Sequence, residues 1–170
     1  MKFKHFLLPA LLLLALAQTN CKKDDDPGGS PVPTEQQIIP AQGLTDIKIG
    51  DAAQKAIDKY GTTSPSFGSV NGQYTHFLIY LDKGVSVYCE QTTVATFNAQ
   101  MKIKSITLSA PFKGQTDKKI GIGSKKADVK AAYGEPTSSS AFFGDTYAIG
   151  ITFVYDDAGA VVESIEVEKP

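Results

Sequence analysis

The stretch IKIGDAAQKAIDKYGTTS, residues 47–64, reads like a second stretch, IGIGSKKADVKAAYGEPT, residues 120–137. Each begins Ile-x-Ile-Gly, continues with a capping residue and a helical pattern, and ends in Tyr-Gly. Asp51 and Ser124 predict helix N-caps, because their side-chain oxygens can accept unpaired backbone N–H groups. The glycine after each tyrosine suits the residue that ends a helix, and a proline then prevents its continuation. The chain is therefore predicted to contain two short helices in equivalent settings.

The similarity between the two halves continues into the expected strands. GVSVYCE (84–90) parallels GITFVYD (150–156), and KIKSITLSAP (102–111) parallels VVESIEVEKP (161–170). One further strand is expected before each of these pairs, in YTHFLIYL and in SAFFGDTYAI. We therefore predict one α+β domain, residues 44–170, with both helices on one face of an antiparallel sheet. It consists of two pseudo-repeats, about 44–111 and 117–170, each with one short helix plus three strands.

Strand alternation separates an apolar face of this sheet from a polar face. Val85, Val87 and Cys89 point to the apolar face, and their neighbours point away from it. The polar face is the candidate binding face, since an exposed tyrosine on a polar sheet suits contact with a protein or a glycan. Alternatively, the loop 91–100 or the preceding linker covers it. The candidate residues are Tyr88, Ser86, Thr107, Thr152, Val154 and Glu166.

The N-terminus is typical of an export signal. A basic start precedes the apolar run FLLPALLLLALA, residues 6–17, which is shorter than the roughly 20 residues of a membrane-spanning helix. Cleavage before Cys21, with diacylglycerol attached to its sulfur, resembles the processing of bacterial lipoproteins and would remove residues 1–20. The alternative is ordinary cleavage after Ala17, which would leave a secreted chain that begins at Gln18.

The segment that follows Cys21 predicts a disordered tether, residues 21–43. It is dense in proline, glycine and charge, and offers little apolar surface to bury. Such a tether would hold a domain clear of a membrane, and stable anchoring needs more than one acyl chain, such as diacylglycerol with palmitate. Lys22, Lys23, Asp24, Asp25 and Asp26 resemble the surface-export signal of Bacteroidota-type lipoproteins. This implies the outer membrane and favours its outer leaflet, the alternative being a generic solvated spacer.

Composition argues against several classes of ligand. The chain has no arginine, the side chain best suited to bidentate phosphate recognition, and its formal net charge is −1. His5 and His76 are the only histidines, too few for a histidine-rich metal site. We therefore expect no nucleic-acid partner, no metal and no cofactor.

No set of residues in the sequence is typical of a catalytic site. Cys89 alternates with buried valines and is expected to be a buried thiol, and nothing in the sequence places His76 beside it as a base. Glu163, Glu166 and Glu168 are expected to be strand residues in contact with solvent and not a glycosidase pair. The protein is predicted not to be an enzyme.

The pattern from residue 120 onward resembles two related families. It reads IGIG-S-x-x-x-x-V-x-x-x-YG-x-P and then GI-x-F-x-Y-D-x-x-G-x-V-x-S-I-x-V. This is similar to the repeat of the small outer-membrane lipoproteins of the SmpA/OmlA type and of the tandem-repeat β-lactamase inhibitor proteins. The resemblance implies a non-enzymatic scaffold whose sheet face can meet another protein. Each half lacks room for the second helix that those folds often carry, so their partners do not transfer to this chain.

The sequence thus favours a lipid-anchored cell-envelope module that binds an envelope protein. A carbohydrate-binding accessory lipoprotein is the alternative, although the chain has no tryptophan for sugar stacking. A small hydrolase is a third hypothesis, and it lacks a convergent acid–base set.

Overall fold

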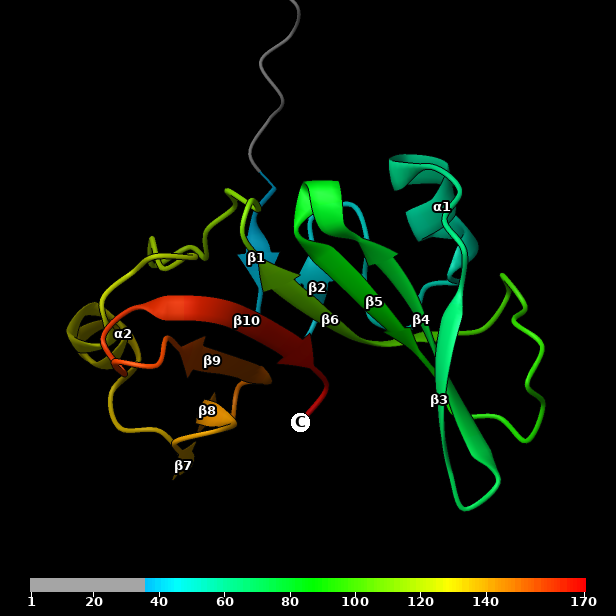
Figure 1. The fold of residues 1–170 in the computed structure, drawn as a ribbon. Helices are drawn as coiled ribbons and strands as arrows, with labels where there is room; N and C mark the ends of the chain where they lie inside the picture. The colour runs from blue at the N-terminus through cyan, green and yellow to red at the C-terminus, as the bar shows by residue number, and fades with distance from the viewer. Residues whose placement is uncertain (1–35) are drawn as a thin grey trace, which may run out of the picture. The chain divides into compact units, whose positions relative to one another are not determined.

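Eight strands form one antiparallel sheet, and two further strands form a small hairpin (Figure 1). The computed structural model describes residues 36–170. The order in the large sheet is β3-β4-β5-β6-β10-β9-β8-β7, with every neighbouring pair antiparallel. The strands are β1 (Ile38–Ile39), β2 (Gly43–Leu44), β3 (Ser66–Val70), β4 (Gln73–Tyr80), β5 (Val85–Cys89), β6 (Ile103–Ser109), β7 (Ser138–Ser140), β8 (Gly144–Tyr147), β9 (Ile151–Tyr155) and β10 (Val162–Glu168). The helices are α1 (Gln54–Tyr60), the 3₁₀ turn η1 (Leu81–Lys83) and α2 (Lys126–Tyr133).

The fold is mostly β, so the α+β prediction of two pseudo-repeats with one helix plus three strands each is wrong. Each half of the sheet is a meander of four strands, not three. The prediction missed β3 outright and merged β7 and β8 into one strand. All five side chains of β3 are exposed and β7 consists of three serines, so neither shows the alternation that signals a strand. The helices are only seven and eight residues long.

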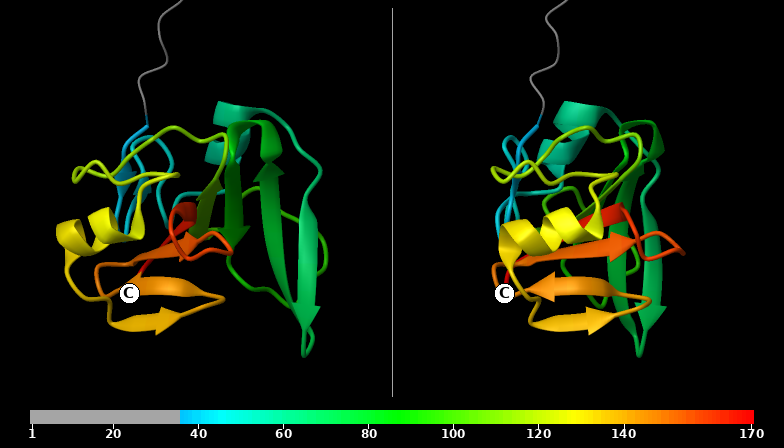
Figure 2. Two further views of the ribbon diagram at one scale, coloured as in Figure 1. Left: turned by 60° about the vertical axis from the view of Figure 1, so that its left-hand side comes forward. Right: turned by 90° about the vertical axis from the view of Figure 1, so that its left-hand side faces the viewer.

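The two meanders meet at β6 and β10, whose register is symmetric about one pair. Thr107 lies opposite Glu166, and on either side of this pair Ile106 faces Val167 and Leu108 faces Ile165. The sheet twists strongly, as large antiparallel sheets do. In the right-hand view of Figure 2, β8 and β9 run nearly across the picture while β3 and β4 stand upright.

One hydrophobic core spans both halves of the sheet. Val87, Leu108, Phe153 and Ile165 are each fully buried on the apolar side. The prediction that two helices cover this face is also wrong. Within its bounds α1 fully buries only Ala56, and α2 fully buries only Val129, so the helices are not the main cover. Non-helical segments supply most of the apolar cover, through Ile38, Leu44, Ile47, Phe112 and Ile120.

The predicted N-caps have a different role. Asp51 Oδ2 accepts a hydrogen bond from the backbone N–H of Lys48 at 2.8 Å, and Ser124 Oγ accepts one from Gly121 N–H at 3.0 Å. Each side chain therefore closes the turn before its helix, and the N-cap positions are Ala53 for α1 and Lys125 for α2, with no side-chain cap. Turn closure competes with capping, because the same oxygen can accept a local backbone donor on either side.

The folded region begins before residue 44. Ile38 in β1 is 1% exposed and belongs to the core, and its N–H donates to the carbonyl of Gln115 at 2.9 Å. Residues 38–43, which were predicted to belong to a disordered tether, are therefore part of the fold, because Ile38 and Leu44 both bury their side chains in the core. The predicted signal peptide, Cys21 and the charged residues 22–26 lie outside the described residues. Within residues 36–170, no helix combines the length and apolar character needed to cross a bilayer.

Candidate functional site

The six residues of the candidate face lie on one side of the sheet. Four of them form a row across adjacent strands, in which Ser86 faces Thr107, Thr107 faces Glu166, and Glu166 faces Thr152. Tyr88 and Val154 flank this row, opposite Ser105 and Ser164 respectively. The antiparallel register thus brings together side chains that are separated by up to eighty positions in the sequence.

Two apolar side chains on this face were missed by the sequence analysis. Phe77 lies opposite Tyr88, with ring centroids 5.1 Å apart and ring planes at 60°, and Ile79 lies opposite Ser86. Ile79 is 38% exposed, and both rings are partly exposed. The alternation of YTHFLIYL, which buries His76, Leu78 and Tyr80, could have placed Phe77 and Ile79 here. The candidate face therefore consists of the six predicted residues together with Phe77 and Ile79.

Glu166 is the charged group at the centre of the candidate face. Burial raises the pKa of its carboxyl group, a hydrogen bond with Ser105 lowers it in part, and the neighbouring carboxylate of Glu168 raises it again. Glu166 takes part in none of the ion pairs found among residues 36–170. An acceptor that has lost water without gaining a cation favours a donor from outside.

The surroundings of Glu166 are hydroxyl-rich and only slightly exposed. Thr152 is 7% exposed and Ser105 is 8% exposed, although both belong to the polar side of their strands. The hydroxyl of Thr152 donates to that of Thr146 at 3.1 Å. An open hollow of about 550 Å³ adjoins this region and is lined by Tyr88, Glu90, Lys104 and Ser105, among others.

The loop 91–100 contacts both sides of β4, and its contacts with His76 lie on the core side. The carbonyl of Val94 lies 3.1 Å from His76 Nε2, and the ring of Phe97 is 6.0 Å from that of His76. His76 is 1% exposed and lies on the core side of β4. Gln91 Nε2 in turn donates to Thr75 Oγ1 at 3.4 Å, and Thr75 shares its side of β4 with Phe77 and Ile79, so the start of the loop borders the candidate face.

Cys89 is a buried side chain, 1% exposed. Continuing the β4–β5 register by one residue places His76 opposite it, a neighbourhood that the sequence did not indicate. Burial, with a contribution from the Glu90 carboxylate, raises the pKa of the Cys89 thiol to about 11. The group is therefore a thiol at neutral pH, and it lacks the thiolate character of a nucleophile.

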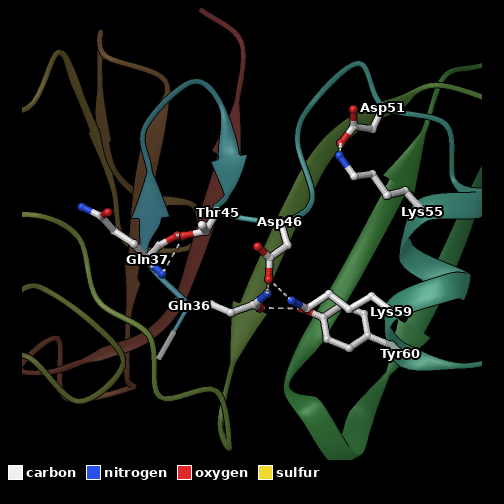
Figure 3. A network of polar contacts seen from close by, with 8 residues as sticks. All are labelled: Gln36, Gln37, Thr45, Asp46, Asp51, Lys55, Lys59 and Tyr60. Atoms are coloured by element: carbon white, nitrogen blue, oxygen red, sulfur yellow. Dashed lines mark hydrogen bonds and ion pairs between the residues drawn. The ribbon is translucent and has the colours of Figure 1, made fainter. Parts of the chain in front are cut away.

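A polar network fixes the start of the described chain to α1 (Figure 3). Tyr60 Oη donates to Gln36 Oε1 at 2.7 Å, Gln36 Nε2 donates to Asp46 Oδ2 at 3.2 Å, and Lys59 pairs with Asp46. The hydrogen bonds from Lys59 and Gln36 lower the pKa of Asp46, and burial raises the pKa of Tyr60 to about 12. These contacts anchor the chain and bring together no reactive groups.

Among the described residues, no three His, Cys, Asp or Glu side chains gather in a way that could hold a metal ion. The buried carboxylate of Asp145 is held by Lys126 and Ser139 and ties the β7–β8 hairpin to α2. The candidate face is therefore the feature with the clearest capacity to meet another molecule.

Comparisons with family models, with curated proteins and with solved structures found no match for this chain.

Proposed function

We propose that the protein is a lipid-anchored lipoprotein of the cell envelope that binds another envelope protein and has no catalytic role. The N-terminal pattern around Cys21 supports the anchor, and the candidate face supports the binding role. The proposed location is the outer membrane, with the folded region held near its surface by the residues that follow Cys21.

One observation carries the binding role: Phe77, Tyr88 and Ile79 form a partly exposed apolar cluster on β4 and β5, on the side of the sheet that also presents the half-buried carboxylate of Glu166 on β10. Protein–protein contacts characteristically have aromatic side chains at their centre and, around them, polar groups that can form hydrogen bonds. A partner that buries the two rings and donates to Glu166 would use both features together.

The ring geometry disfavours the carbohydrate alternative. Sugar rings stack on flat aromatic platforms, whereas the planes of Phe77 and Tyr88 are inclined at 60°. The hydroxyl groups of this face could still bind a glycan edge, so a polysaccharide is an outcome that the experiment must separate.

The test is site-specific photo-crosslinking in Bacteroidota-type cells that export the full chain. A benzoylphenylalanine at Tyr88 is expected to give one discrete protein adduct. The matched control places the same group at Phe142, an aromatic residue that is 87% exposed on the β7–β8 turn. Equal labelling at both positions, or a polysaccharide adduct at Tyr88, would contradict the binding role. The mass of the mature N-terminus tests the anchor separately, and a chain that begins at Gln18 would rule it out.

A further inference from the structure

β3 is the longer of the two edge strands of the sheet, five residues against three for β7. All five of its side chains are exposed. In the described part of the chain, residues 66–70 make no hydrogen bond beyond their ladder with β4. The outer edge therefore presents backbone N–H and C=O groups that another strand can pair with.

This edge lacks the features that normally prevent strand pairing. Natural edge strands carry lysine, proline or a bulge. Residues 60–81 contain no Lys, Arg, Asp or Glu, although 21% of the chain is charged. The β3–β4 register runs without a shift from Ser66 to Val70, and two apolar side chains of β3 are exposed, Phe67 at 52% and Val70 at 70%.

The hairpin turn determines which backbone groups point outward. Asn71 and Gly72 have φ values of 52° and 75°, typical of a two-residue type I′ turn. In such a hairpin the residues that flank the turn exchange both hydrogen bonds, and pairs then alternate along the ladder. Val70, Gly68 and Ser66 thus face β4 with their backbone groups, while those of Phe67 and Ser69 point to the free edge.

We propose that β3 pairs antiparallel with β3 of a second copy of this chain, about a two-fold axis at Gly68. Phe67 of each copy then exchanges two hydrogen bonds with Ser69 of the other, so every outward group of β3 is used. A register centred on Phe67 would instead set Ser69 against Pro65, which has no N–H to donate. The two sheets become one continuous sheet across the axis.

The same register covers the exposed apolar side chains. Phe67 lies opposite Ser69 of the second copy, and because Ser69 is itself paired with Tyr74, Tyr74 of that copy lies one strand further along the same row. Val70 lies opposite Ser66 of the second copy, and Phe77 of that copy lies one strand further along the same row. Gly68 faces Gly68, which allows close approach, and no like charges meet because neither β3 nor β4 carries a Lys, Arg, Asp or Glu side chain. The edge of β3 is thus complementary to a second β3 in hydrogen bonding, side-chain size and charge, which favours a second copy of this chain over an unrelated strand.

The first test is a symmetric disulfide in the full chain that carries Cys21→Ser, where the remaining Cys89 is buried. In the proposed register, residues 68 of both copies form a non-hydrogen-bonded pair with Cα atoms about 4.5 Å apart, within the range of about 4.4–6.8 Å that a disulfide spans. Gly68→Cys is expected to oxidise to a covalent dimer. The control is Val70→Cys, which faces residue 66 of the other copy and should stay monomeric. Equal dimer yields from both variants would overturn the register.

The second test measures association without a crosslink. The unmodified chain is expected to sediment as a dimer, and Ser69→Pro as a monomer, because proline removes only an N–H that points outward. Circular dichroism establishes that the variant is folded. Should Ser69→Pro unfold, Gly68→Lys replaces it, since it sets two ammonium groups opposite each other at the axis. A monomeric unmodified chain would overturn the proposal, as would a β3 crosslink only to a different protein.

Discussion

Among residues 36–170, Asp145 is the one acidic residue that is buried. Its Oδ2 lies 3.2 Å from Lys126 Nζ, its Oδ1 accepts a hydrogen bond from Ser139, and Lys126 also lies over the ring of Tyr155 at 4.3 Å. Burial raises the pKa of Asp145, but the bonds from Ser139 and Lys126 outweigh it, so the pKa lies below its ordinary value. The charged form is therefore the form that the fold stabilises.

We expect Asp145→Asn to lower the free energy of unfolding by about 1–3 kcal/mol at neutral pH, because a buried hydrogen-bonded charge is lost. A lowered folded-state pKa contributes stability above the unfolded-state value, and that stability disappears as the pH falls through the folded-state value. The difference between the two proteins should thus shrink below about pH 4. Urea denaturation at neutral and acidic pH measures it.

The control for this residue is Asp82→Asn, since Asp82 is exposed and pairs only with its neighbour Lys83. It should leave the unfolding free energy unchanged at both pH values. A difference at Asp145 that persists undiminished in acid would show that shape, and not charge, accounts for the effect.

The elements are joined by turns in which a glycine touches the backbone of another strand. Gly84 has φ of 65° between η1 and β5, and a Cβ at this position would lie 2.0 Å from the carbonyl oxygen of Ser109. The N–H of Ser109 in turn donates to the carbonyl of Gly84 at 2.9 Å. The close approach of this turn to the end of β6 therefore depends on the missing side chain.

We expect Gly84→Ala to destabilise the protein by about 3 kcal/mol or more, because backbone must move as well as adopt a left-handed conformation. Gly123→Ala is the matched control, since Gly123 also has a positive φ but open space around its Cβ position. That change should cost only about 1–2 kcal/mol. Thermal unfolding of the two variants gives the comparison, and equal losses would indicate that conformation alone matters.

Across residues 36–170 the molecule has one hydrophobic core and not one for each half of its sheet. Leu108 on β6 faces Val85 on one side and Ile165 on the other, so it belongs to both meanders. A core shared in this way couples the two halves, and they should unfold together.

We expect Leu108→Ala to lower the unfolding free energy by about 2–5 kcal/mol while unfolding remains a single transition. The signals to compare are far-ultraviolet circular dichroism and tyrosine fluorescence, which should change at the same urea concentration. Lys104→Ala, an exposed change on the same strand, should stay within about 0.5 kcal/mol of the parent. Two separate transitions in the parent protein would contradict a shared core.

The sequence by itself determined the alternation of β5, β6, β9 and β10, and hence which of their residues lie on the candidate face. It also placed glycines 61 and 134 at the ends of the two helices. Both kinds of signal are local: side chains repeat every 3.6 residues in a helix and every 2 residues in a strand, and a glycine follows the last helical residue. The identity of the face as a binding surface stays a prediction, as does the lipid anchor at Cys21.

Only the tertiary structure decided the fold class, because β3 and β7 are strands by virtue of their neighbours and not of their own side chains. The same is true of Ile38, whose burial depends on contacts far along the chain, and of Phe77, which meets Tyr88 only through the register of β4 with β5. Backbone pairing between distant segments is set by the whole sheet, and a local sequence pattern carries no record of it.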